Sequence, residues 1–196
     1  MIGAISLLRR RDDIDAARFR QHWLDIHGPL VCRMPGLRSY AQSHVIAALT
    51  PAARAMAIGG FAELAFDSVA ARATAYGSPE LAACDRDSPG FIGSVSRLIT
   101  EATVVIPRPD TLDLAKLVVL FPPETTADRA TLERLRPSGL IWHRVLEQGR
   151  APNSAVPELR CPVAALAELW GTAALAPDDI YADQVGVFSV IEHRLH

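Results

Sequence analysis

The stretch FRQHWLDIHGPLV, residues 19–31, decides the fold because it defines the first helix. Asp15 lies before it at a position suited to an N-cap, where a carboxylate accepts hydrogen bonds from free backbone amides. Apolar side chains recur at helical spacing and form one stripe: Phe19, Trp23, Ile26 and Leu30. Gly28 and Pro29 predict the end of this helix, since glycine tolerates a left-handed cap and proline cannot continue the hydrogen-bond ladder.

The segments around this helix have the order of a ferredoxin-like unit. One strand is predicted before it, at residues 3–9. Two strands follow it, at 36–46 and 59–68. An alanine-rich helix broken near Gly77 (69–84) and a β-branched strand (97–107) complete the order. This order predicts an antiparallel sheet with helices on one side only. The other face of that sheet then needs a partner or forms a pocket.

The rest of the chain repeats this order with losses. Strands are predicted at 116–121, 139–147, 166–171 and 185–195, and a helix at 126–135. LAELWG (166–171) aligns Glu168 with Glu63 of FAELAF (61–66), although VAALAELWGTAALA by itself has a helical composition. The second helix of this half is short or absent. We therefore predict an α+β fold of tandem ferredoxin-like units, 1–110 and 111–196, packed sheet to sheet as an internal pseudo-dimer.

Composition excludes several classes of function. The chain has 20 basic and 22 acidic residues and a formal net charge of −2, so it offers no electrostatic footprint for nucleic acid or an anionic membrane. The start MIGAISLLRRR reverses the order of a signal peptide, and no run of about 18 apolar residues could span a bilayer as a helix. Cys32, Cys84 and Cys161 are too far apart for a disulfide framework or a zinc site. We expect a cytoplasmic protein with a small-molecule partner, either as the pseudo-dimer alone or as a homodimer of it.

Other signatures of metal or cofactor chemistry are missing from the sequence. It contains no glycine-rich phosphate loop, no nucleophile elbow and no zinc-type spacing of Cys or His. His22 and His27 are five residues apart, which at about 100° per residue puts them on different sides of an α-helix. We therefore expect His22 at the surface, no metal ion and no cofactor.

The helix signature and the strands around it carry a family resemblance. The signature consists of His22, Trp23, His27, Gly28, Pro29 and Leu30, and the surrounding stretches are AISLLRRR, GLRSYAQSHVI, GFAELAFDS, SPE and TEATVVI. On these residues, which cover most of 3–107, the first half resembles the EthD family within the dimeric α+β barrel proteins.

This resemblance implies a ferredoxin-like unit that pairs face to face and leaves a cavity between sheet and helices. Members with assigned activity include cofactor-free isomerases of lactones and dehydratases or cyclases of aromatic polyketides. Others have a supporting role in oxidative degradation pathways. Other dimeric α+β barrels bind haem, but nothing in this sequence singles out an axial histidine. Fold-level analogy supports a site more than it supports a reaction.

Three candidate catalytic residues lie on the two central strands of the first half. His44 and Glu63 are about equally far from a loop centred near residues 53 and 54, so we expect them opposite each other. A carboxylate beside an imidazole raises its basicity and fixes its tautomer, as proton transfer between carbons requires. Tyr40 lies on the same predicted face and could donate to a substrate carbonyl. The alternative is that His44 and Glu63 form a structural pair.

His27 is the fourth candidate catalytic residue. It could cap the helix C-terminus, or border the cavity, as the matching family position does. Trp23 is either core or part of a cavity wall that favours flat aromatic substrates, and Gln42 and Phe61 are expected to bind substrate. The second half offers a weaker alternative pocket: Trp142, His143 and Glu147.

The leading hypothesis is a cofactor-independent enzyme that moves protons on a lactone or an aromatic polyketide-like substrate. His27 and His44 would exchange protons, Glu63 would tune one of them, and Tyr40 would hold the substrate oxygen. The alternative is a non-catalytic protein that binds a hydrophobic ligand or assists a degradation pathway. A third possibility, a purely structural interaction module, would need an exposed apolar sheet face that docks another chain. The internal repeat argues against this need, because the two sheets can face each other within one chain.

Overall fold

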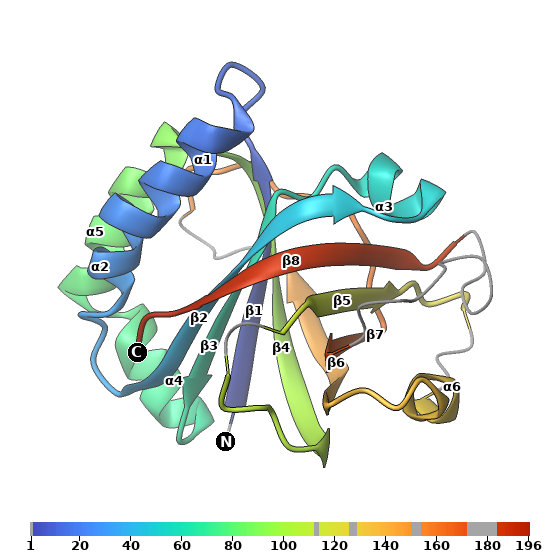
Figure 1. Ribbon diagram of the computed structural model, residues 1–196. Helices are drawn as coiled ribbons and strands as arrows, with labels where there is room; N and C mark the ends of the chain where they lie inside the picture. Colours follow the sequence, from blue (N-terminus) through green and yellow to red (C-terminus); the bar gives the residue numbers. More distant parts are fainter. Residues whose placement is uncertain (1, 112–113, 126–128, 150–153, 172–183) are drawn as a thin grey trace.

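A computed structural model describes residues 2–111, 114–125, 129–149, 154–171 and 184–196. Within these ranges, eight antiparallel strands form a closed barrel (Figure 1) in the order β1-β3-β2-β8-β5-β7-β6-β4, with β4 pairing back onto β1. The strands are β1 (Ile2–Arg10), β2 (Leu37–Ala48), β3 (Gly60–Phe66), β4 (Ile92–Ile106), β5 (Lys116–Phe121), β6 (Gly139–Gly149), β7 (Ala165–Trp170) and β8 (Gly186–Arg194). The predicted combination of helices with an antiparallel sheet is confirmed, and 166–171 is a strand rather than a helix.

The two halves of the chain contribute four neighbouring strands each. The first half supplies β4-β1-β3-β2 and the second supplies β8-β5-β7-β6, so the first, second, third and fourth strand of each half take equivalent places. The halves join through hydrogen-bonded edges, β2 to β8 and β4 to β6, which closes one barrel. The sheets therefore do not stack as two separate layers.

Helices lie unevenly around the barrel. Figure 1 shows α1, α2, α4 and α5 together on one side and α6 on the other. Their bounds are α1 (Ala16–His22), α2 (Gly28–Val31), α3 (Pro51–Met56), α4 (Val69–Tyr76), α5 (Pro79–Asp87) and α6 (Arg129–Arg134), with a π-helical turn η1 (Trp23–His27) between α1 and α2 and a 3-10 turn η2 (Ser88–Gly90) after α5. The predicted helix 69–84 is thus two helices, broken where Gly77 was expected to interrupt it. Helix α3 was not predicted, because its segment was interpreted as a loop.

Alternation along the strands separates the apolar core inside the barrel from the apolar cores on its outer face. On β1, Ala4 and Leu8 point outward and pack under the helices, whereas Ile5 and Leu7 point into the barrel. The outer core contains Phe19 and Trp23 of the first helix, as the apolar stripe predicted. A helical layer therefore covers the outer face of β1 to β4, and this is where the pocket described below lies.

The first helix does not end at Gly28 and Pro29. It continues through the π-helical turn to Val31, with φ −53° at Gly28 and a backbone hydrogen bond from the Gly28 amide to the carbonyl of Trp23, five residues back. Proline lacks an N–H and therefore fits the first turn of the following segment without leaving an unpaired donor. Glycine is favoured here by close packing, since an added Cβ would lie 2.9 Å from Leu195 Cδ1 and 3.0 Å from Gln42 Nε2.

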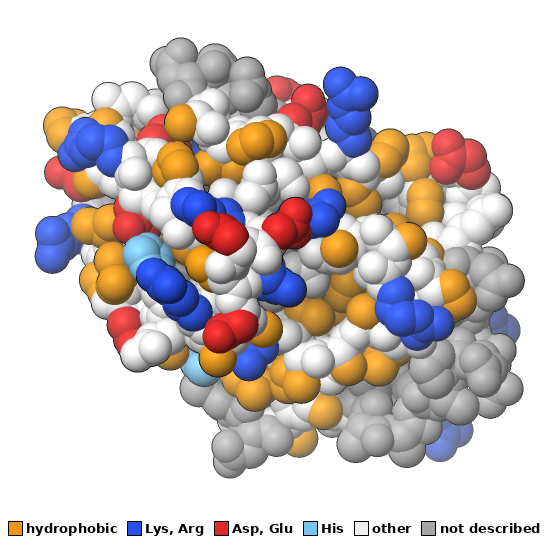
Figure 2. Space-filling model, turned by 90° about the horizontal axis from the view of Figure 1, so that it is seen from above, with side chains coloured by type: hydrophobic (Ala, Val, Ile, Leu, Met, Phe, Trp, Pro, Cys, Tyr) orange, Lys and Arg blue, Asp and Glu red, His pale blue; other side chains and the backbone are white. Residues whose placement is uncertain are grey.

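The described helices are all too short or too polar to cross a membrane. On the face drawn in Figure 2, lysine and arginine side chains are interspersed with aspartate and glutamate rather than gathered into a field of one sign.

Candidate functional site

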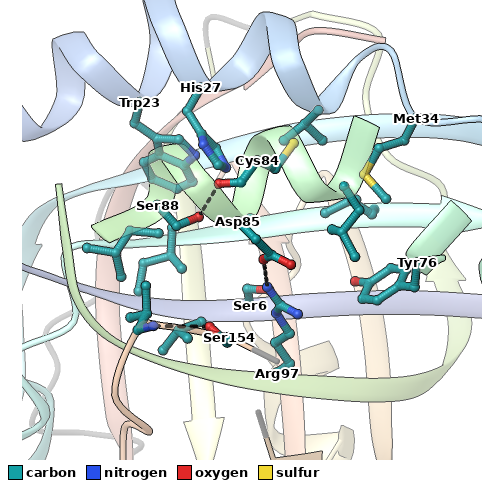
Figure 3. A pocket seen from close by; sticks show the side chains of 18 of the residues that line it. Ser6, Trp23, His27, Met34, Tyr76, Cys84, Asp85, Ser88, Arg97 and Ser154 are labelled. Atoms are coloured by element: carbon teal, nitrogen blue, oxygen red, sulfur yellow. Dashed lines mark hydrogen bonds and ion pairs between the residues drawn. The ribbon is translucent and has the colours of Figure 1, made fainter. Parts of the chain in front are cut away.

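A pocket of about 60 Å³ lies between the helical layer and the outer face of the first four strands. Its floor follows from the register, because Arg97, Ser6, Ala62 and Gln42 form one row of directly paired positions across β4, β1, β3 and β2. The two middle members of this row are small, which leaves space under the helices. Figure 3 shows Trp23 and His27 entering the pocket from the helical layer and Arg97 reaching Asp85 from the sheet.

His27 is held by a carboxylate that sequence analysis did not identify. Its Nδ1 lies 2.9 Å from Asp87 Oδ2, and His22 Nε2 lies 2.9 Å from Asp87 Oδ1. Both imidazoles reach one carboxylate because the π-helical turn has more residues per turn than an α-helix. The expectation that His22 and His27 lie on different sides of the helix is therefore wrong, and the helix-end cap for His27 is also wrong.

The Asp87 contact fixes the chemistry of His27. Hydrogen bonds from His27 and His22, with burial opposing them, hold the pKa of the Asp87 carboxyl below its usual range. A carboxylate that accepts from Nδ1–H leaves Nε2 as the free lone pair of a neutral imidazole. His27 is 8% exposed and lines the pocket, so that lone pair can act as a base on a bound molecule.

Tyr40 also lines the pocket, and its hydroxyl is held from two sides. Trp23 Nε1 donates to Tyr40 Oη at 3.2 Å, and Gln42 Nε2 donates to it at 2.8 Å. Gln42 Nε2 also donates to the carbonyl oxygen of Trp23 at 2.9 Å. Because a carbonyl oxygen can only accept, this bond fixes the orientation of the Gln42 amide. Both contacts use Tyr40 as acceptor, so its own proton remains available for an acceptor in the pocket. Burial raises the pKa of Tyr40, which keeps this proton on the phenol.

His44 and Glu63 do not form the predicted pair. Ala41, not His44, is opposite Glu63, while His44 is opposite Gly60. Helix α3 makes the connection between β2 and β3 asymmetric, so the actual register differs from the predicted one by three residues. An odd shift reverses the face of every side chain, and Glu63 therefore points into the barrel while His44 points outward.

His44 lies beside the pocket rather than in it. It stacks on Trp23 with ring centroids 4.5 Å apart, and its Nε2 donates to Gln42 Oε1 at 2.8 Å. Burial lowers the pKa of His44 to about 3, with smaller contributions from His193 and Arg20. It therefore remains neutral at ordinary pH and borders a separate surface hollow that it shares with His193. It contacts the pocket through the ring of Trp23, which lines it, and through Gln42, which holds the Tyr40 hydroxyl.

Glu63 belongs to a charged cluster inside the barrel. Lys116 Nζ lies 2.8 Å from Glu63 Oε1, 2.6 Å from Glu168 Oε2 and 2.7 Å from Glu192 Oε2. Burial, and then the charge of Glu168, raises the pKa of Glu63 to about 7. The carboxylate oxygens lie within 4.8 Å of one another and could in principle hold a metal ion, but the Lys116 ammonium is already within contact of all three. The cluster has the composition of a structural ion network.

The remaining predicted residues are divided between these regions. Phe61 lies inside the barrel against Phe188, at 5.3 Å between ring centroids, and not in the pocket. His143 also points into the barrel, where Nε2 lies 2.7 Å from Glu168 Oε1, so the weaker alternative pocket is not supported by its contacts. The pocket thus brings together Trp23, His27 and Tyr40.

Asp87 and Arg97 are the functional candidates that sequence reasoning missed. Asp87 ends α5 in the run Asp85-Arg86-Asp87, which has the pattern of an ordinary exposed helix end. Arg97 is one of many arginines, and only strand pairing places it beside Ser6. No local pattern distinguishes either residue, because both roles arise from contacts far apart in the sequence.

Comparison with known proteins finds a family match in the first half of the chain. Residues 11–94 match the family model of the EthD domain, which confirms the resemblance of the first half. No curated protein matches the chain.

Two solved structures resemble the chain in fold over almost its whole length, and a third covers about half of it. An anthrone oxidase-like protein has a TM-score of 0.60 at 9% identity, covering 99% of this chain and 93% of its own. A proposed monooxygenase of Fusobacterium nucleatum subsp. nucleatum has a TM-score of 0.56 at 8% identity, covering 97% and 92%. An EthD family protein of Bacillus halodurans, 23% identical with a TM-score of 0.44, covers 52% of this chain and 97% of its own. Similarity at such low identity shows the fold alone.

Proposed function

We propose that the protein is a cofactor-independent enzyme that moves a proton between two carbons of a small lactone. The observation that carries this proposal is the combination, in one pocket, of the His27–Asp87 pair with a buried phenol whose proton is unused. A base with a fixed tautomer and a preorganised donor for a developing oxyanion are the two groups that enolisation requires.

The proposed reaction is a 1,3-proton shift. His27 Nε2 removes a proton from the carbon next to the lactone carbonyl, and the electron pair moves onto the carbonyl oxygen. Tyr40 donates a hydrogen bond to this enolate oxygen, and Asp87 stabilises the imidazolium. His27 then returns the proton to the distal carbon of the dienolate, which moves the double bond and regenerates the base.

Pocket size favours a lactone over an aromatic polyketide. A volume of about 60 Å³ is smaller than the about 150 Å³ of a cavity that binds benzene, so the helical layer has to move outward even for a single five-membered ring. The names of the structural neighbours refer to anthrone oxidation and monooxygenation. A three-ring anthrone would require a far larger opening than a small lactone, so the volume does not favour that chemistry here.

We also propose that the second half is a repeat of the first, with 1–110 and 111–196 as the two units of an internal pseudo-dimer. The equivalent strand order of the two halves supports this proposal. The second unit would close the barrel and hold β2 and β4 in place, while the first unit would carry the reaction.

The test uses α-angelica lactone, whose isomerisation to the conjugated β-isomer is a 1,3-proton shift that ultraviolet absorbance detects. The wild type should accelerate this reaction, and His27→Asn should lower kcat/KM by about 100-fold or more, because general-base catalysis contributes about that much. The matched control is His22→Asn, which removes the other imidazole on Asp87 but lies outside the pocket and should cause a smaller loss.

Equal activity of the wild type and His27→Asn would contradict the proposed mechanism. If the wild type binds the lactone but never isomerises it, a non-catalytic binding or accessory role becomes the better account.

A further inference from the structure

Arg97 presents a donor that the protein leaves unused. Its Nη1 is buried and has no hydrogen-bond partner, whereas its Nη2 lies 3.4 Å from Asp85 Oδ1. The side chain is 17% exposed and lines the same pocket as His27. A buried guanidinium nitrogen without a partner is costly, and such groups in folded proteins are usually satisfied by a ligand or an ordered water.

The position of Arg97 relative to Tyr40 defines the two ends of the pocket floor. Arg97 stands on β4 and Tyr40 on β2, with β1 and β3 between them. Three interstrand spacings of about 4.8 Å separate these outer strands by roughly 14 Å at the backbone, and both long side chains shorten this gap. The side chains between them are small, because Ser6 of β1 and Ala62 of β3 occupy the positions paired in register with Arg97. A short molecule can therefore lie along the floor with an acceptor at each end.

The unpaired donor, rather than a net positive charge, favours an anionic group at the Arg97 end, because Asp85 also lines the pocket and offsets the charge of Arg97. Asp85 engages one terminal nitrogen and so holds the guanidinium plane, while the other terminal nitrogen stays free. Asp87 is already occupied by two imidazoles. Guanidinium groups bind carboxylates by charge-assisted hydrogen bonds, which are stronger than bonds between neutral groups.

We propose that the substrate of this pocket is a small lactone that carries a carboxylate group, whose carboxylate binds Arg97 and whose reacting carbonyl accepts from Tyr40. The identity of the reacting carbonyl rests on the proposed function, whereas the carboxylate subsite does not. Arg97 then selects and orients the substrate, and His27 stands above the carbon between the two anchored ends.

The test measures binding with three probes of similar length, by isothermal titration and by chemical-shift changes in the NMR spectrum. 4-Oxopentanoate carries both groups, 2-hexanone lacks the carboxylate, and pentanoate lacks the carbonyl. Wild-type protein should bind 4-oxopentanoate about 10- to 100-fold more tightly than 2-hexanone, the range expected for one charge-assisted contact. Arg97→Gln should remove this difference.

Arg72→Gln is the matched control. Arg72 lies over the ring of Tyr76 at 4.2 Å, and Arg97 approaches the same ring at 5.7 Å, but Arg72 does not line the pocket. This control removes one positive charge from the same neighbourhood and should keep the preference for 4-oxopentanoate.

Equal affinity for 4-oxopentanoate and 2-hexanone, or an unchanged preference in Arg97→Gln, would overturn the carboxylate subsite and mean that Nη1 binds only water. Failure of the proposed reaction looks different. In that case 4-oxopentanoate binds through Arg97, but the α-angelica lactone assay shows no turnover that depends on His27.

Discussion

At the scale of single residues, the proposed chemistry depends on how two side chains are held rather than on which residues are present. In the proposed reaction His27 acts as a base because Asp87 accepts from its Nδ1. Tyr40 becomes a donor because Trp23 and Gln42 already occupy its oxygen. Each active group therefore needs a partner that does not itself touch the reacting carbon.

Asp87→Asn tests this dependence. An amide can present N–H to the imidazole and favour the tautomer in which Nε2 carries the proton, so His27 would lose its free lone pair. We expect kcat on α-angelica lactone to fall by about 100-fold or more while KM changes little. The thermal unfolding midpoint is measured in parallel, and a loss of activity that simply follows a loss of folded protein would count against this role.

The candidate site was partly predictable at this scale. The helix signature singled out His27 and Trp23, and alternation placed Tyr40, Gln42 and His44 on one face of their strand. The pairing of His44 with Glu63 was not predictable, because a short connection can contain a helix such as α3 that shifts the register. Face assignment across two strands requires the register, and one sequence does not supply it.

At the scale of elements, the π-helical turn η1 is the feature that builds the site. It places His22 and His27 on one carboxylate although they are five residues apart. A regular α-helix would turn them about 140° apart. Sequence periodicity predicted the helix but not this turn, because its wider spacing depends on packing against the sheet, including the bond from Gln42 to the Trp23 carbonyl.

Insertion of one alanine after Leu24 tests the role of this turn. The added residue separates the two imidazoles by six positions instead of five and rotates His27 relative to His22 by about 100°. We expect the helix content from circular dichroism to persist, while activity on α-angelica lactone falls to the level of His27→Asn. Retained activity in a folded insertion variant would show that the turn does not position His27.

At the scale of the whole molecule, the closed barrel separates the pocket of the proposed reaction from the buried charged cluster. The pocket lies outside the barrel under the helices, and the charged cluster around Lys116 lies inside it. The ferredoxin-like order of the first half was evident from the sequence, since its strands and helices alternate clearly. The edge-to-edge closure was not, because strand pairing between the two halves depends on contacts such as Ala41 with Arg194 that no local pattern encodes.

The charged cluster predicts a pH-dependent stability. Glu63 titrates near pH 7 in the folded protein, above the 4.5 of an ordinary glutamate, so the folded state binds its proton more tightly than the unfolded state. Its contribution is complete below about pH 4.5 and is lost as the pH rises to about 7. The free energy of unfolding in urea should therefore decrease across this window in the wild type, relative to Glu63→Gln. Parallel curves for the two proteins would exclude this titration.

The central claim is that His27 removes a proton from a carbon next to a carbonyl in this pocket. The most direct measurement is the rate at which α-angelica lactone exchanges its C3 protons for deuterium in D2O, followed by NMR with wild type and His27→Asn. We predict exchange that is faster than the uncatalysed rate with wild type and returns to that rate in the variant. Exchange at the uncatalysed rate with both proteins would contradict the account.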